Sequence, residues 1–190
     1  PDYIICHESI HEELVRLLKK EIDAQFGANP LDNADYGKII NQKHFDRLTG
    51  HIQPERVAHG GVADAASIRI TPTILDGVTW SDPVMQEEIF GPILPILTYQ
   101  ELDKTLADIE TRPHPLALYC FTEQESVKQQ VLERCHFGGG CFNDTLIHLA
   151  TAEMPFGGIG ESGMGQYHGQ AGFDEFTHMC SIVDRATWFE

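Results

Sequence analysis

PILPILTY (Pro92–Tyr99) is an almost unbroken apolar run. A run of this length that is rich in isoleucine and leucine predicts a β-strand, and continuous rather than alternating hydrophobicity is typical of a strand covered on both faces. Directly after it, Leu102, Leu106 and Ile109 recur at helical spacing, and Pro113 ends that pattern. The stretch therefore predicts a strand followed by a helix inside an α/β fold.

The same order of elements recurs on both sides of this unit. The short apolar runs that predict further strands are YIIC (3–6), RVAHGG (56–61), IRITPTILDGV (68–78), LALYCFT (116–122) and GGGCFND (138–144). Apolar residues at helical spacing occupy residues 10–22, 41–50 and 127–132. Pro72 favours a sheet edge or a bulge. We therefore expect an α/β fold, with a mostly parallel twisted sheet and helices on both faces, in one domain.

The composition argues against several classes of function. No apolar run approaches the roughly 20 residues that span a bilayer, and the first residues show no signal-peptide pattern. The formal net charge of −16 disfavours binding to nucleic acid or to anionic lipid. Five cysteines without a C-x-x-C pair are typical of reduced thiols inside a cell. We expect a cytoplasmic protein with no nucleic-acid partner and no membrane segment in this chain.

The stretch HESIH (7–11) fits the zinc-protease pattern H-E-x-x-H, which requires both histidines on one face of a continuous helix. Ser9 and Glu12 have the spacing of a capping box, so we expect the helix to begin near Ser9. His7 would then precede the helix, while His11 would lie in its first turn. A metallopeptidase is therefore the disfavoured interpretation, and we assign no metal site.

A second short pattern, GIGESG (158–163), fits the dinucleotide fingerprint G-x-G-x-x-G. A true fingerprint follows a strand, opens a helix and lies inside a βαβ unit, so that the pyrophosphate meets the helix N-terminus. Only 27 residues follow this match, too few for the rest of a nucleotide-binding half. We favour a glycine loop packed against a neighbouring element.

Two longer stretches are far more specific when they are taken together. These are MQEEIFGPILPI (85–96) and MPFGGIGESGMGQYHG (154–169). Shorter matches in the same order are PDYIIC (1–6), YGKIIN (36–41), RITPTIL (69–75), PLALYCF (115–121) and GFDEFTH (172–178). Over essentially its whole length the chain resembles the aldehyde dehydrogenase superfamily, particularly its class 3 branch of dimeric enzymes. The resemblance implies the α/β fold of that family's C-terminal catalytic domain, which agrees with the alternation of elements.

The resemblance also implies roles for individual residues. The glutamate of E-I-F-G-P, here Glu88, hydrogen-bonds the nicotinamide ribose hydroxyls in that family, and Phe90 matches the ring that packs near the nicotinamide. Phe156 matches a residue near the cavity for substrate and cofactor. Asn143 matches a loop asparagine with a structural role close to the site. We therefore expect Glu88 and Phe90 to bind cofactor, and Phe156 and Asn143 to lie at the substrate cavity.

The family's catalytic groups fall outside the match. Its cysteine nucleophile lies just upstream of the proline matched by Pro1, and its general-base glutamate, oxyanion-hole asparagine and NAD-binding domain lie further upstream. Cys6 matches a strand position after the nucleophile, so we assign no catalytic residue in this chain. We expect residues 1–175 to form the C-terminal catalytic domain and residues 176–190 a terminal strand or tail that pairs with another domain or subunit.

The resemblance implies part of an enzyme that oxidises an aldehyde to a carboxylic acid with NAD or NADP, through a thiohemiacetal on cysteine. Its partners would be a small aldehyde, the N-terminal NAD-binding domain and further copies in a homo-oligomer. We expect the isolated chain to be inactive, to bind no cofactor and to self-associate. The alternative is a free-standing interaction or regulatory module of the same fold.

Overall fold

The computed structural model describes residues 1–188. The chain divides into two compact units, Pro1–Glu101 and Leu102–Glu190. The catalytic domain that we expected over residues 1–175 therefore stays a prediction.

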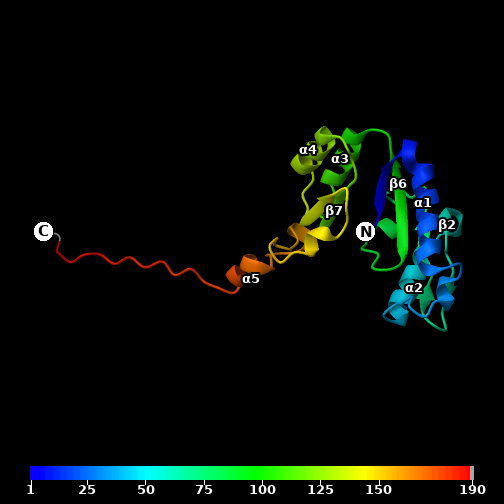
Figure 1. The fold of residues 1–190 in the computed structure, drawn as a ribbon, viewed down its shortest axis with the longest axis horizontal. Coiled ribbons are helices and arrows are strands. Elements are labelled where there is room, and N and C mark those ends of the chain that lie inside the picture. Colours follow the sequence, from blue (N-terminus) through cyan, green and yellow to red (C-terminus); the bar gives the residue numbers. More distant parts are fainter. Residues whose placement is uncertain (189–190) are drawn as a thin grey trace. The chain divides into compact units, whose positions relative to one another are not determined.

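The first unit is built on a four-stranded sheet with the order β1-β6-β5-β2. Figure 1 labels β6 and β2 of this sheet together with the helices α1 and α2. Its strands are β1 (Ile4–His7), β2 (Val57–His59), β5 (Thr73–Leu75) and β6 (Ile93–Tyr99). The pairs β1–β6 and β5–β6 are parallel, and β2 is antiparallel to β5. The predicted strand at 92–99 is thus confirmed, and it lies between two parallel neighbours.

Helices cover the two faces of this sheet. On one face, α1 (Glu8–Phe26) packs through Val15 against Cys6, Ile74 and Ile96. On the other face, α2 (Gln42–His51) contributes Phe45 and Leu48 to a core that includes Leu75, Ile93 and Leu97. Burial of each such side chain contributes roughly 1.5–3 kcal/mol, which explains why the central strand reads as apolar throughout.

The start of α1 differs from the predicted capping box. The helix begins at Glu8, and the ring Nδ1 of His7 accepts a hydrogen bond from the Ser9 N–H at 3.2 Å. An imidazole nitrogen therefore caps the helix where a serine hydroxyl was expected.

The run 68–78 does not form one strand. It is divided into β4 (Arg69–Ile70), which pairs antiparallel with β3 (Ala63–Asp64), and β5 in the four-stranded sheet. The break falls at Thr71 and Pro72, because proline cannot donate to a strand ladder. Short 3-10 turns complete this unit at Pro30–Asp32, Pro54–Arg56 and Pro83–Met85.

The second unit contains a two-stranded parallel sheet, β7 (Ala117–Cys120) and β8 (Gly139–Phe142). The helices α3 (Leu102–Glu110) and α4 (Glu125–Arg134) pack on one face through Leu106 and Val131. The remaining elements are two 3-10 turns and one short helix: η4 (Ile147–Leu149), η5 (Gly160–Ser162) and α5 (Gly169–Glu175).

The fold class is confirmed, since the described strands that pair are mostly parallel and helices pack against them. Residues 176–188 contain no helix or strand and are exposed, so pairing of this tail with another domain or subunit stays a prediction. Within the described residues no helix is both long and apolar enough to cross a membrane.

Candidate functional site

The first unit presents Glu88 and Phe90 from the segment 86–91, which links the turn Pro83–Met85 to β6. Ile89 points into the core and is 1% exposed, whereas Phe90 is 81% exposed. Phe90 has a φ of 51°, a left-handed conformation that is rare for an aromatic residue. The strain costs on the order of 1–3 kcal/mol, and such strain persists only where surrounding contacts enforce it.

The guanidinium of Arg47, from α2, supplies three of these contacts. Its Nη2 donates to the carbonyl oxygen of Ile89 at 2.5 Å, and its Nη1 donates to the carbonyl oxygen of Glu88 at 3.3 Å. The same Nη1 lies 3.2 Å from Oε1 of Glu87, and this hydrogen bond from Arg47 holds the pKa of Glu87 below its usual value. One side chain thus fixes three successive residues.

Two further contacts hold the segment from other directions. The Ile89 N–H donates to Oδ1 of Asp2 at 2.9 Å, which ties the segment to the residues before β1. Gly91 lies so close to α2 that a Cβ there would be 2.6 Å from both Cδ atoms of Leu48. A side chain at this position would have to displace Leu48, which is fully buried.

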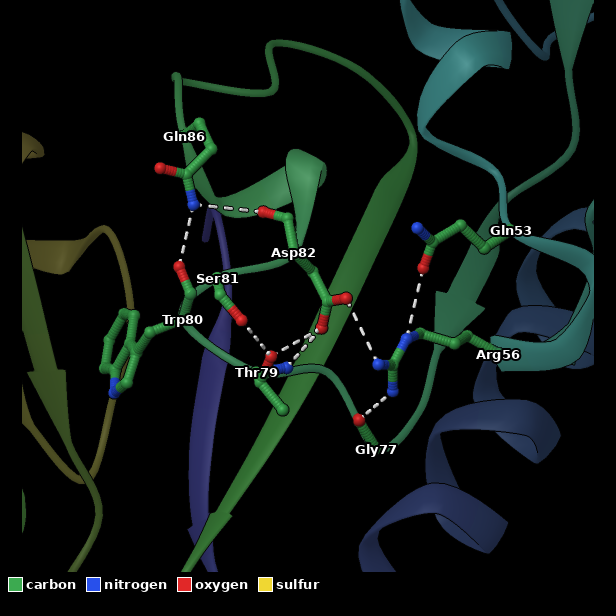
Figure 2. A network of polar contacts seen from close by, with 8 residues as sticks. All are labelled: Gln53, Arg56, Gly77, Thr79, Trp80, Ser81, Asp82 and Gln86. Atoms are coloured by element: carbon green, nitrogen blue, oxygen red, sulfur yellow. Dashed lines mark hydrogen bonds and ion pairs between the residues drawn. The ribbon is translucent and has the colours of Figure 1, made fainter.

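A polar network lies directly upstream, where Gln53 and Arg56 join residues 77–86 (Figure 2). Arg56 donates to Oδ1 of Asp82 at 3.1 Å, and Oδ2 of Asp82 accepts from the Thr79 N–H at 2.6 Å. The Nε2 of Gln86 donates to the carbonyl oxygens of Trp80 (2.7 Å) and Asp82 (3.2 Å). These hydrogen bonds therefore hold the turn that directly precedes the 86–91 segment.

The segment presents one carboxylate and one aromatic ring to its surface. No described residue binds the Glu88 carboxylate by hydrogen bond or ion pair, so both of its oxygens are available as acceptors. Phe90 supplies an exposed apolar surface two residues along.

Asn143, in the second unit, joins the ends of β7 and β8. Its Oδ1 accepts from the Thr122 N–H at 2.8 Å, and its Nδ2 donates to the Thr122 carbonyl oxygen at 3.0 Å. Its own N–H donates to the Cys120 carbonyl oxygen at 2.9 Å, and its φ is 58°. These contacts give the asparagine a structural role, because its amide takes the place of one further pair of strand hydrogen bonds.

Phe156 lies in a cluster of aromatic rings. Its backbone pairs with Tyr167 through two hydrogen bonds of 2.8 and 2.9 Å, and the two rings meet edge to face at 5.6 Å. The ring of His168 stacks on Phe156 at 5.9 Å, and His148 lies 6.2 Å away. Phe156 therefore closes one side of a packed cluster and is itself half-buried.

A thiol–imidazole contact adjoins this cluster. Sγ of Cys141 lies 3.5 Å from Nδ1 of His148, which is 8% exposed and lies against the ring of Tyr119. The thiol and the imidazole are within the distance of a hydrogen bond that involves sulfur.

The environment of Cys6 does not suit a nucleophile. It lies in β1 opposite Thr98 and is 4% exposed. Burial raises the pKa of its thiol, and the negative charge of Asp76 raises it further. A catalytic cysteine needs the opposite environment, one that favours the thiolate.

The histidines of HESIH have separate partners. His7 caps α1 and meets the ring of Tyr99 edge to face at 5.2 Å. Nε2 of His11 lies 2.6 Å from Oδ1 of Asp76. The two imidazoles are thus directed to different groups, and no set of three potential metal ligands occurs within residues 1–188.

The glycine pattern 158–163 forms a tight turn that contains the 3-10 helix Gly160–Ser162. A Cβ on Gly158 would lie 2.3 Å from the backbone of Ser162, and the Ser162 hydroxyl closes the turn on Ile159. The turn opens no long helix, so the geometry favours the packed glycine loop over a nucleotide fingerprint.

The sequence did not indicate Arg47 or Asp2. Arg47 has the pattern of an ordinary solvated residue on α2, and its acceptors are about 40 residues away along the chain. The carbonyl oxygens that it binds carry no side-chain signature at all, so nothing in a single sequence could have marked the contact.

The comparisons agree with the motifs. The model of the aldehyde dehydrogenase family matches residues 1–182. The 4,4'-diaponeurosporen-aldehyde dehydrogenase of Staphylococcus aureus is 49% identical over 100% of this chain and 42% of its own length. The dimeric, NADP-preferring aldehyde dehydrogenase of Rattus norvegicus is 44% identical over 96% of this chain and 40% of its own length.

A solved structure described as the substrate-bound state of Staphylococcus aureus AldH superposes with a TM-score of 0.93 at 49% identity, over 100% of this chain and 42% of that one. The chain thus spans about two fifths of the length of the relatives that it matches. Because the family model covers nearly the whole sequence, this chain belongs to the aldehyde dehydrogenase family.

Proposed function

We propose that this chain works as the C-terminal catalytic-domain part of a class 3-like, NAD(P)-dependent aldehyde dehydrogenase. That enzyme would oxidise an aldehyde to a carboxylic acid through a thiohemiacetal on a cysteine outside this chain. The observation that carries the proposal is the 86–91 segment, which presents Glu88 and Phe90 on a strained backbone held by Arg47, Asp2 and α2.

In this proposal NAD or NADP supplies the hydride acceptor. Glu88 accepts hydrogen bonds from the two hydroxyls of the nicotinamide ribose, since a carboxylate has two acceptor oxygens at a matching separation. Phe90 limits the drift of the nicotinamide ring through apolar contact. Together these residues orient the cofactor, and the catalytic steps use groups supplied by the rest of the enzyme.

The second unit contributes two further residues to the proposal. Asn143 holds the ends of β7 and β8 together, and Phe156 forms an apolar wall of the substrate cavity. This assignment is supported by the double hydrogen bond to Thr122 and by the aromatic cluster around Phe156.

We assign the protein to the cytoplasm and to a homo-oligomer. The first assignment is supported by five free cysteines, which are typical of a reducing compartment. The second is supported by the apolar side chains of the tail, of which Phe176, Met179 and Val183 are each at least 90% exposed. Light scattering that gave a clean monomer at high concentration would remove the support for an oligomer.

The decisive experiment compares two polypeptides. The 190-residue chain is assayed for NAD(P)⁺-dependent oxidation of an aldehyde beside a longer polypeptide that also carries the nucleotide-binding part. We expect turnover from the longer polypeptide alone. Turnover by the 190-residue chain would contradict the division of roles proposed here.

A substitution tests the role of Glu88 in the longer polypeptide. Glu88→Gln should raise the KM for NAD(P)⁺ about tenfold or more, the effect of losing a charge-assisted hydrogen bond. Glu55→Gln, at an exposed glutamate of the same unit, is the matched control and should leave that KM unchanged. Equal KM values for the two variants would disprove the cofactor role.

A further inference from the structure

Neither the sequence motifs nor the family match gives a role to Arg47. We propose that Arg47 is a positioning residue, which fixes the conformation of the 86–91 segment so that Glu88 and Phe90 point outward together. This inference rests on the proposed function, because the conformation matters for cofactor binding only if Glu88 and Phe90 bind the cofactor. The contacts of Arg47 do not depend on that function.

The guanidinium reaches the carbonyl oxygens of two consecutive residues, Glu88 and Ile89, with two different nitrogens. A planar guanidinium presents its donors in a rigid fork, so two bonds to adjacent carbonyls fix the orientation of the peptide between them. That orientation determines the direction in which the chain enters Phe90.

Phe90 has a φ of 51° and is 81% exposed, so it gains little from packing that would compensate for its conformation. The residues on either side are held instead. Ile89 is bound through its carbonyl to Arg47 and through its N–H to Asp2, and Gly91 lies against Leu48. Without Arg47, one of these restraints is lost.

The carboxylate of Glu87 is not the main partner of Arg47. Its side chain is 54% exposed, and an exposed ion pair contributes little. The side chain of Arg47 is 22% exposed, and its shortest hydrogen bond goes to a backbone oxygen. We therefore expect the backbone contacts to carry the effect.

Amide hydrogen exchange of the 190-residue chain tests the proposal without any assay of activity. In Arg47→Gln, the Ile89 amide should exchange about tenfold faster, because the charge-assisted hydrogen bonds that hold the segment are lost. Amides of β6 should keep their protection. In Arg47→Lys, the increase should be nearly as large, because an ammonium cannot supply the fork.

Two control variants separate positioning from general stabilisation. Glu87→Gln should change the exchange of Ile89 by less than Arg47→Gln does. Arg16→Gln removes an arginine whose side chain is 62% exposed and paired with Glu13 in α1, and it should leave the segment unaffected. Unchanged exchange in both Arg47 variants would overturn the proposal. Equal acceleration across the segment and β6 would overturn it too, because Arg47 would then only stabilise the unit.

The KM for NAD(P)⁺ in the longer polypeptide distinguishes failure of this proposal from failure of the proposed function. If Arg47→Gln loosens the segment while Glu88→Gln leaves the KM unchanged, the cofactor role is wrong and the positioning role stands. If Glu88→Gln raises the KM while the segment stays rigid without Arg47, the positioning role is wrong and the cofactor role stands.

Discussion

Arg56 and Asp82 form an ion pair, with 3.1 Å between Nη2 and Oδ1, that closes the turn upstream of the proposed cofactor segment (Figure 2). Both partners have other contacts, since Arg56 donates to the Gly77 carbonyl oxygen and Asp82 accepts from the N–H and hydroxyl of Thr79. The side chain of Asp82 is only 12% exposed. Such a pair differs from a surface ion pair because removal of one partner leaves polar groups without acceptors in a place that water reaches poorly.

Asp82→Ala should therefore destabilise the first unit by about 2 kcal/mol, since the Thr79 N–H loses its acceptor and the Thr79 hydroxyl and Arg56 each lose one of their partners. Urea unfolding followed by the signal of Trp80 measures this loss. Glu13→Ala removes an exposed partner of Arg16 in the same unit and should leave the unfolding midpoint essentially unchanged. An equal midpoint for both variants would show that the turn contributes nothing.

Acid should weaken the same turn. The hydrogen bond from the Thr79 N–H is the largest of the effects that hold the pKa of Asp82 below its usual value. The unfolded chain then takes up a proton at a higher pH than the folded chain does. The stabilisation is complete above the unfolded pKa, near 3.9, and is lost as the pH falls through the lower folded value. Asp82→Asn should show a smaller loss of stability between pH 5 and pH 3 than the original chain, as measured by the urea midpoint, and identical losses would contradict this account.

Gly91 provides a steric test of the site. In Gly91→Ala the new methyl group would lie 2.6 Å from two carbon atoms of Leu48, whose fully buried side chain would have to shift within the packed core. Overpacking of this kind costs about 1–3 kcal/mol. Gly50→Ala, in the same helix as Leu48, meets nothing within 4 Å and should stabilise by up to about 1 kcal/mol through helix propensity. Opposite shifts of the melting temperature are expected, and shifts of the same sign would contradict the packing argument.

The side-chain amide of Asn143 and its left-handed backbone should make separable contributions to the stability of the second unit. Asn143→Ala loses two hydrogen bonds to Thr122 and also places alanine at a φ of 58°. Together these changes should lower the free energy of unfolding by about 2–3 kcal/mol. Asn143→Gly loses the same hydrogen bonds but tolerates the conformation, so it should cost about 1 kcal/mol less. Amide exchange in β7 and β8 measures both variants. If glycine costs as much as alanine, the left-handed conformation is not a source of strain.

The sequence was sufficient for the parts of the fold that depend on periodicity. The strand at 92–99 and the helix carrying Leu102, Leu106 and Ile109 are present as β6 and α3, because burial on both faces imposes a pattern that a single chain displays. The helix cap at His7 and the division of the run at Pro72 depend on local hydrogen bonds, which propensity does not determine. The support of Glu88 and Phe90 was missed because Arg47 binds mainly backbone oxygens.

Thiol reactivity should follow the burial of the five free cysteines. Cys180 is exposed, whereas Cys6 and Cys135 are 4% and 5% exposed, and burial raises the pKa of both buried thiols. Iodoacetamide at pH 7.5 should therefore modify Cys180 at least tenfold faster than Cys6, since only the thiolate reacts. Mass spectrometry of digested samples gives the rates, and a sample unfolded in urea should show similar rates at every cysteine. Fast modification of Cys6 in the folded chain would mean that β1 opens readily, and it would reopen the question of whether this thiol takes part in catalysis.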